Sequence, residues 1–156
     1  MQQARELDLD EVARLIDALH NPNPESNLLD RVVMDSLLSY DTVNRKIAGQ
    51  LADTWKQVDD KTLEFQLRDD IKWHDGQPVT TDDVIPSLKR WFAKDALGGL
   101  LGRSTADMTS VDARTFRIVL KEPFGLMLKA LAKSSSVPAF IVPKRAAETP
   151  VSQQFS

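Results

Sequence analysis

The alternation of apolar and polar side chains predicts a β-hairpin near the middle of the chain. Leu63, Phe65 and Leu67 occupy every second position, so they share one face of an extended strand. Residues 55–58 alternate in the same way. The intervening residues 59–61 supply a turn, because an aspartate side chain can accept a hydrogen bond from the backbone two residues on.

The same pattern occurs a second time further along the chain. Residues 111–121 match residues 58–68 in chemical type at most positions. Each copy has an Asp-x-basic-Thr corner followed by three apolar residues that face one side. Two copies are too few for a solenoid. We therefore expect two hairpins of one small antiparallel sheet.

Other segments place apolar residues at the spacing of an amphipathic helix. The predicted helices are residues 8–19, a segment that starts at Ser26 or Asn27 and includes Leu29, Val33 and Leu37, residues 81–94, and residues 124–131. The prolines in residues 21–24 end the first helix, because a proline disfavours a helical residue before it. Thr80 and Asp83 resemble a capping box at the start of the third helix.

Two further segments complete the predicted organisation. Residues 95–102 are apolar and rich in glycine, and we expect a flexible loop there. Residues 139–142 predict a short strand or extended segment. Two hairpins with covering helices make an α+β fold. The predicted domains are a helical segment at residues 1–20, a small α+β subdomain at residues 21–150 and a tail at residues 151–156.

Composition excludes several classes of function. The chain has 156 residues and a net charge of −3, which argues against the basic surface that nucleic-acid binding requires. It has no cysteine, and its two histidines, His20 and His74, are too few for a convincing metal cluster. Neither a membrane-spanning run nor a signal peptide is expected. We accordingly expect no metal, no cofactor and no nucleic-acid partner.

Candidate catalytic groups are better explained by local structure. His74 and Asp75 are adjacent, but no third group is evident to orient a base, and Asp75-Gly76 is typical of a tight turn. Residues 69–70 and 82–83 lack the alternating ligand spacing of a calcium loop. Residues 134–136 are three serines without the glycines of a nucleophile elbow. We therefore expect no enzymatic activity.

Residues 65–84, FQLRDDIKWHDGQPVTTDDV, closely resemble the hallmark segment of the extracellular solute-binding proteins of peptide and nickel ABC importers, family 5. Further segments resemble the same family in the right order. They are residues 24–27, 40–41 with 50–55, 120–124 and 139–144. The resemblance covers about residues 21–147, most of the chain, and implies the small α+β subdomain of a periplasmic peptide-binding protein.

Two features depart from the family pattern. Residues 5–19 read as a helix, where the family begins with a β-strand. Several hundred family residues, including the opposing lobe, have no counterpart in this sequence. By position in the family, the resemblance implies ligand-proximal residues at Asn21, Pro22, Asn23, Gly98, Gly99, Leu100 and Leu101. Two alternatives remain open for Leu100 and Leu101, namely core or a lip over a ligand or partner lobe.

The resemblance implies part of the substrate-binding component of an ABC transporter. Its partners would be a peptide or small solute and an ABC permease, and it would act in the periplasm or at the cell surface. The alternative is a free-standing interaction or sensor domain derived from such a protein. In that case self-association would cover the apolar surface of the exposed lobe.

Overall fold

The computed structural model describes residues 35–73, 75–133, 137–150 and 152. The predicted helix at residues 8–19, most of the second predicted helix and Asn21 to Asn23 lie outside them. The described elements are β1 (Leu38–Asp41), β2 (Lys46–Gly49), β3 (Ala52–Asp59), β4 (Thr62–Leu67), α3 (Thr81–Lys94), α4 (Ala96–Ser104), β5 (Thr105–Ser110), β6 (Thr115–Leu120), α5 (Met127–Leu131) and α6 (Lys144–Ala147).

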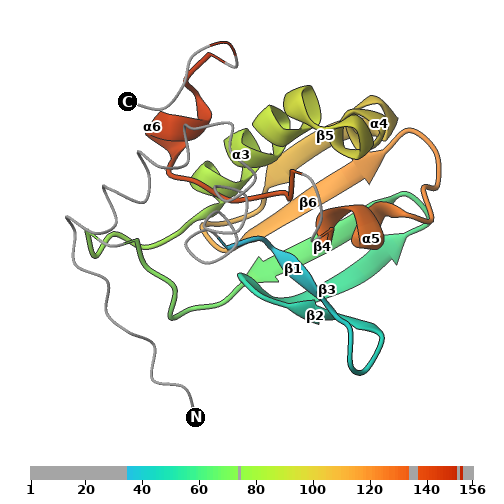
Figure 1. Ribbon diagram of the computed structural model, residues 1–156, viewed down its shortest axis with the longest axis horizontal. Coiled ribbons are helices and arrows are strands. Elements are labelled where there is room, and N and C mark those ends of the chain that lie inside the picture. Colours follow the sequence, from blue (N-terminus) through green and yellow to red (C-terminus); the bar gives the residue numbers. More distant parts are fainter. Residues whose placement is uncertain (1–34, 74, 134–136, 151, 153–156) are drawn as a thin grey trace.

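The two predicted hairpins are confirmed, and they form one antiparallel sheet with the strand order β3-β4-β6-β5 (Figure 1). The central strands pair Phe65 with Phe116. These two rings stack with their centroids 5.2 Å apart and are both fully buried. The α+β fold class predicted from the sequence is therefore correct.

The two hairpin corners use the same chemistry. Asp59 Oδ1 accepts a hydrogen bond of 2.8 Å from the Lys61 amide. Asp112 Oδ1 accepts hydrogen bonds from the amides of Arg114 and Thr115, both 2.8 Å long. The repeated Asp-x-basic-Thr sequence thus encodes a repeated turn.

A further hairpin, β1–β2, was not predicted. The helical pattern extended to Leu37, but Ser36 forms a β-bridge with Phe140, and β1 begins at Leu38. The prediction at Leu37 was wrong because Leu37 and Leu38 are adjacent and both fully buried, and a short apolar run does not distinguish a helix from a strand.

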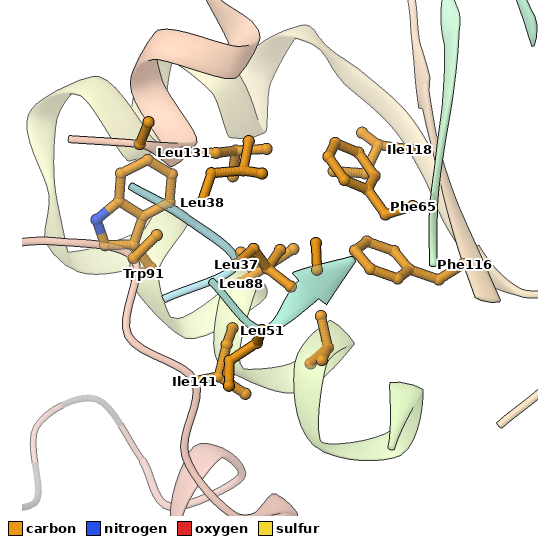
Figure 2. Packing of buried hydrophobic residues seen from close by; sticks show 14 of the residues in the cluster. Leu37, Leu38, Leu51, Phe65, Leu88, Trp91, Phe116, Ile118, Leu131 and Ile141 are labelled. Carbon is orange, nitrogen blue, oxygen red and sulfur yellow. The ribbon is translucent and has the colours of Figure 1, made fainter. Parts of the chain in front are cut away.

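Helix α3 has the bounds that the sequence predicted. Thr80 and Asp83 form the expected capping box, in which the Thr80 amide donates to Asp83 Oδ2 over 3.1 Å. Val84, Leu88 and Trp91 lie on the buried side of the helix. They pack against residues from the sheet, from α5 and from the extended segment at residues 139–142 (Figure 2).

The predicted loop at residues 95–102 is instead most of helix α4. Gly98 lies so close to α3 that a Cβ added there would be 2.8 Å from the Trp91 carbonyl oxygen and 2.9 Å from its ring. A Cβ at Gly102 would lie 2.9 Å from Phe92 Cβ. The glycines therefore permit close packing of two helices. This packing offsets their poor intrinsic helix propensity.

The helix predicted at residues 124–131 is partly correct, and the extended segment predicted at residues 139–142 is correct. The helix predicted at residues 124–131 is shorter, because α5 includes only Met127–Leu131 and turns precede it. Residues 139–142 are extended, as predicted, and make a single bridge through Phe140. Ala139 and Ile141 belong to the same core as the sheet and helices, and Figure 2 shows Ile141 at the edge of this cluster.

Candidate functional site

The predicted ligand-proximal residues of α4 have different surroundings. Leu101 is fully buried and belongs to the core, whereas Leu100 on the same helix is 40% exposed. Gly98 is buried against Trp91, and Gly99 is half-buried. Of these four residues, the surface of α4 therefore offers Leu100 and part of Gly99 to a partner. Asn21, Pro22 and Asn23 lie outside the described residues.

An ion pair fixes the start of α4. Asp95 is its N-cap and accepts a hydrogen bond of 2.8 Å from the Gly98 amide. Lys133, which follows α5, pairs with the other carboxylate oxygen at 2.5 Å. Burial acts to raise the pKa of Asp95, but the bonds from Lys133 and Gly98 outweigh it and hold the pKa below its usual value. The ion pair thus joins α4 to α5.

A second hydrogen bond holds the corner between α3 and α4. Trp91 Nε1 donates to the carbonyl oxygen of Val137 over 2.8 Å. The chain on both sides of residues 134–136 is therefore tied to the α3–α4 corner, through Lys133 on one side and Val137 on the other. Sequence analysis missed the role of Asp95, although an aspartate immediately before an apolar run is a recognised helix-start signal.

The hallmark segment is built around Asp83. Its Oδ2 accepts hydrogen bonds from the Thr80 amide and from Trp73 Nε1, the latter 3.2 Å long. Its Oδ1 accepts from the Lys144 amide over 2.8 Å. This buried carboxylate therefore joins the segment before α3, the start of α3 and the start of α6.

The turn inside the hallmark segment is closed by backbone bonds. The Trp73 amide donates to the Gln77 carbonyl over 2.8 Å, and Asp75 Oδ1 accepts from the Gln77 amide over 3.0 Å. Gly76 has a φ of 82°, in the left-handed region that glycine adopts without strain. The turn predicted for Asp75-Gly76 is thus confirmed, and the Asp75 side chain takes part in it.

One side of α3 holds the segment after residue 137. Ser87 Oγ accepts a hydrogen bond of 3.0 Å from the Val142 amide, and Arg90 donates to the Thr149 carbonyl. Together with Asp83, these residues lie at positions i, i+4 and i+7 of one helix side. They dock residues 142–149 against α3.

Residues 35–36 lie beside residues 140–141. Ser36 and Phe140 form an antiparallel bridge, and the Ile141 amide donates to the Asp35 carbonyl over 3.0 Å. The segment before β1 is thus held by the extended segment that follows α5.

The described residues contain no group of three or more histidine, aspartate or glutamate side chains placed to hold a metal ion. Within the same part of the chain, no helix has the length and apolar character that crossing a bilayer requires.

Known proteins are similar to this chain in sequence and in architecture. The model of bacterial extracellular solute-binding proteins, family 5 Middle, matches residues 46–154. A protein of Sinorhizobium fredii named as a probable peptide ABC transporter periplasmic-binding protein is 37% identical over 125 residues, which are 80% of this chain and 23% of that protein. The periplasmic murein peptide-binding protein MppA of Escherichia coli is 31% identical over 150 residues, 83% of this chain and 27% of MppA.

Solved structures agree with this match. AgaA from A. tumefaciens R10, in complex with agropinic acid, has a TM-score of 0.67 at 26% identity, over 86% of this chain and 28% of AgaA. The murein tripeptide binding protein MppA has a TM-score of 0.62 at 27% identity, over 86% of this chain and 29% of MppA. The chain spans about a quarter of the length of the relatives it matches. It belongs to the family 5 bacterial extracellular solute-binding proteins.

Proposed function

We propose that this chain is part of the substrate-binding component of an ABC importer that captures peptides or similar small solutes. The match of the family model to residues 46–154 carries this proposal, since these residues include most of the sheet-and-helix unit. Relatives are named as binding proteins for peptides, and one solved neighbour holds agropinic acid. Peptides are therefore the first ligands to test, with other small organic solutes second.

The unit would act as a rigid part of a two-lobed receptor. Receptors of this kind close two lobes around the ligand by hinge motion, and a lobe must keep its shape for the closed form to be recognised. The close α3–α4 contact at Gly98 and Gly102 and the Asp95–Lys133 pair support such rigidity. Of the residues predicted at the ligand, those on α4 would contribute through Leu100 and Gly99.

We further propose that the receptor works in the periplasm or at the cell surface and delivers its ligand to an ABC permease. Several relatives are named as periplasmic binding proteins, which supports this location. The permease would recognise the closed receptor, and the ligand would be shared between this unit and the opposing lobe.

Calorimetry with short-peptide mixtures tests the proposal. Sequencing the source DNA on both sides of this segment identifies the whole reading frame, which is expressed for comparison. We expect micromolar peptide binding by the product of that frame. The 156-residue chain alone should bind weakly or not at all, because it spans about a quarter of the length of the relatives it matches and two lobes are needed to enclose a ligand.

Two results would contradict the proposal. Micromolar binding by this chain alone would show that no second lobe is needed. A reading frame confined to this segment would leave no cleft, and the interaction-domain interpretation would then take its place.

A further inference from the structure

The side chain of Arg103 lies along α4, beside Gly99. A Cβ added to Gly99 would be 3.6 Å from Arg103 Nη1, so the guanidinium reaches back over the preceding turn of the helix. This is the direction expected of a helical side chain, which points toward the N-terminus of its helix. Because Gly99 has no side chain, the guanidinium rests close to the helix surface at this point.

No carboxylate of the described residues neutralises this guanidinium. Arg103 is exposed, and it belongs to none of the ion pairs formed within the described part of the chain. Helix α4 has no aspartate or glutamate of its own, and Asp95 at its start is paired with Lys133. A guanidinium is a planar fork of N–H donors that fits both oxygens of one carboxylate. Arg103 therefore offers such a fork to an anionic partner.

The helix that carries Arg103 is firmly held. Gly98 and Gly102 allow α4 to pack closely on α3, and Asp95 fixes its first turn. Leu100, which is 40% exposed, lies one turn before Arg103 on the same side of α4. A cation and an apolar side chain are thus presented together on a fixed support, which reduces the ordering cost of binding a ligand.

We propose that Arg103 binds a carboxylate of the ligand, so that the receptor selects solutes that carry this group. The inference rests on the proposed function, which gives this side of α4 to the ligand through Leu100 and Gly99. Charge complementarity favours a carboxylate, because two parallel N–H groups of arginine bind its two oxygens at once. In a peptide, this carboxylate belongs either to the free C-terminus or to an aspartate or glutamate side chain.

Calorimetry with the complete receptor and three sets of short peptides tests the proposal. The first set has free C-termini and no acidic side chain, the second has amidated C-termini and one glutamate, and the third has amidated C-termini and no acidic side chain. At least one of the first two sets should bind about ten-fold more tightly than the third. The preferred set identifies the source of the carboxylate, whereas equal affinities for all three sets would overturn the proposal.

Two variants with the same change of charge locate the contact. Arg103→Gln should weaken binding of the preferred set at least about ten-fold and leave binding of the third set within about two-fold. Arg145→Gln removes an exposed cation of α6, which begins beside Asp83 at the other end of α3 (Figure 1). It should leave binding of every set within about two-fold. Equal losses in the two variants, or an equal loss for all three sets in Arg103→Gln, would overturn the proposal.

Two further measurements separate a ligand contact from a structural role. Arg103→Lys keeps the charge without the planar fork, so it should bind the preferred set more tightly than Arg103→Gln but less tightly than the natural receptor. Equal affinities of the Lys and Gln variants would overturn the proposal. Without ligand, Arg103→Gln should unfold at the temperature of the natural receptor, and a lower temperature would likewise overturn it.

Failure of this inference differs from failure of the proposed function. Peptide binding by the natural receptor with no preference for a carboxylate would refute the role of Arg103 and leave the receptor function intact. Binding of none of the three peptide sets would refute the proposed peptide-binding function, and the inference with it.

Discussion

Glu64 and Arg117 occupy equivalent positions in the two repeated hairpins and lie directly opposite each other on β4 and β6. Arg117 Nε donates to Glu64 Oε2 over 2.7 Å, and Lys56 on β3 pairs with Oε1 at 3.0 Å. The pairing register therefore places an approximate two-fold axis at this ion pair. The duplicated sequence folds as two hairpins related across the centre of the sheet.

Glu64 should make the free energy of unfolding depend on pH in the acidic range. The hydrogen bonds from Lys56 and Arg117 hold the pKa of Glu64 below its ordinary value of 4.5. A carboxylate with a lowered folded-state pKa stabilises the fold above its unfolded pKa, and this contribution disappears as the pH falls through the folded value. We expect urea unfolding to show a smaller loss of stability in Glu64→Gln than in the natural chain between about pH 7 and about pH 3.

Glu122→Gln is the matched control for this experiment. Glu122 is exposed and belongs to none of the ion pairs in the described residues. Its substitution should leave the acid dependence as it is in the natural chain. An identical response of both variants would show that the ion pair on the sheet does not contribute to stability.

Substitution by alanine should affect the stability differently at Gly98 and at Gly99. Gly98→Ala should destabilise the fold by about 1–3 kcal/mol, because the new methyl group meets the Trp91 carbonyl and ring and neither helix can move freely. In Gly99→Ala the new methyl group meets the Phe92 carbonyl oxygen at 3.4 Å and Arg103 Nη1 at 3.6 Å, both ordinary contact distances. Alanine there should be neutral or should stabilise by up to about 1 kcal/mol, since alanine is the better helix former.

Denaturant titration with tryptophan fluorescence measures both variants. The two substitutions are chemically identical and lie on adjacent residues, so their difference reports on packing alone. Equal effects at Gly98 and Gly99 would mean that α4 does not pack closely on α3.

Asp83 should contribute more to stability than its neighbour Asp82. Asp83→Ala removes the acceptor of the Thr80 and Lys144 amides and of the Trp73 indole, and it should cost about 2–3 kcal/mol. Asp82 is exposed in the first turn of the same helix, where its charge favours the helix dipole. Asp82→Ala should therefore cost less than about 1 kcal/mol.

Thermal unfolding compares these two variants. A larger loss for Asp82→Ala would refute the central structural role of Asp83.

The elements that sequence analysis predicted are those whose signals are local. The hairpins have strict alternation and an aspartate corner, and α3 has both a cap and an apolar stripe, so neighbouring residues suffice. Sequence analysis missed helix α4 because glycine is a poor helix former. Only the close contacts of Gly98 with Trp91 and of Gly102 with Phe92 explain why glycine occurs in this helix. The four-residue strands of β1–β2 are too short for periodicity to separate them from a helix.

The candidate site was less predictable than the fold. The family resemblance selected Gly98 to Leu101 as a group, whereas their burial depends on which side of α4 meets the core. That orientation is set by packing against other helices, through the contact of Gly98 with Trp91 on α3 and through contacts with α5. The Asp95–Lys133 pair is likewise invisible to local patterns, because its partners are 38 residues apart.

Two features of the edge strand β5 oppose the pairing of a strand from another molecule with the sheet. Asp107 Oδ1 accepts a hydrogen bond of 2.9 Å from the Met108 amide, next to a register shift between Thr105 and Asp107. A charged side chain and a bulge are common means of blocking strand addition at a sheet edge. We expect Asp107→Val to free the amide and to promote self-association, measured by sedimentation velocity at increasing protein concentration.

Asp112→Asn provides the comparison for Asp107→Val, since it also removes one negative charge from the β5–β6 hairpin but keeps an acceptor at the corner. It should leave the sedimentation coefficient independent of concentration. Association of both variants would point to lost charge repulsion. Association of Asp107→Val alone would show that a single carboxylate blocks the edge of the sheet, so that contacts between copies must use another surface.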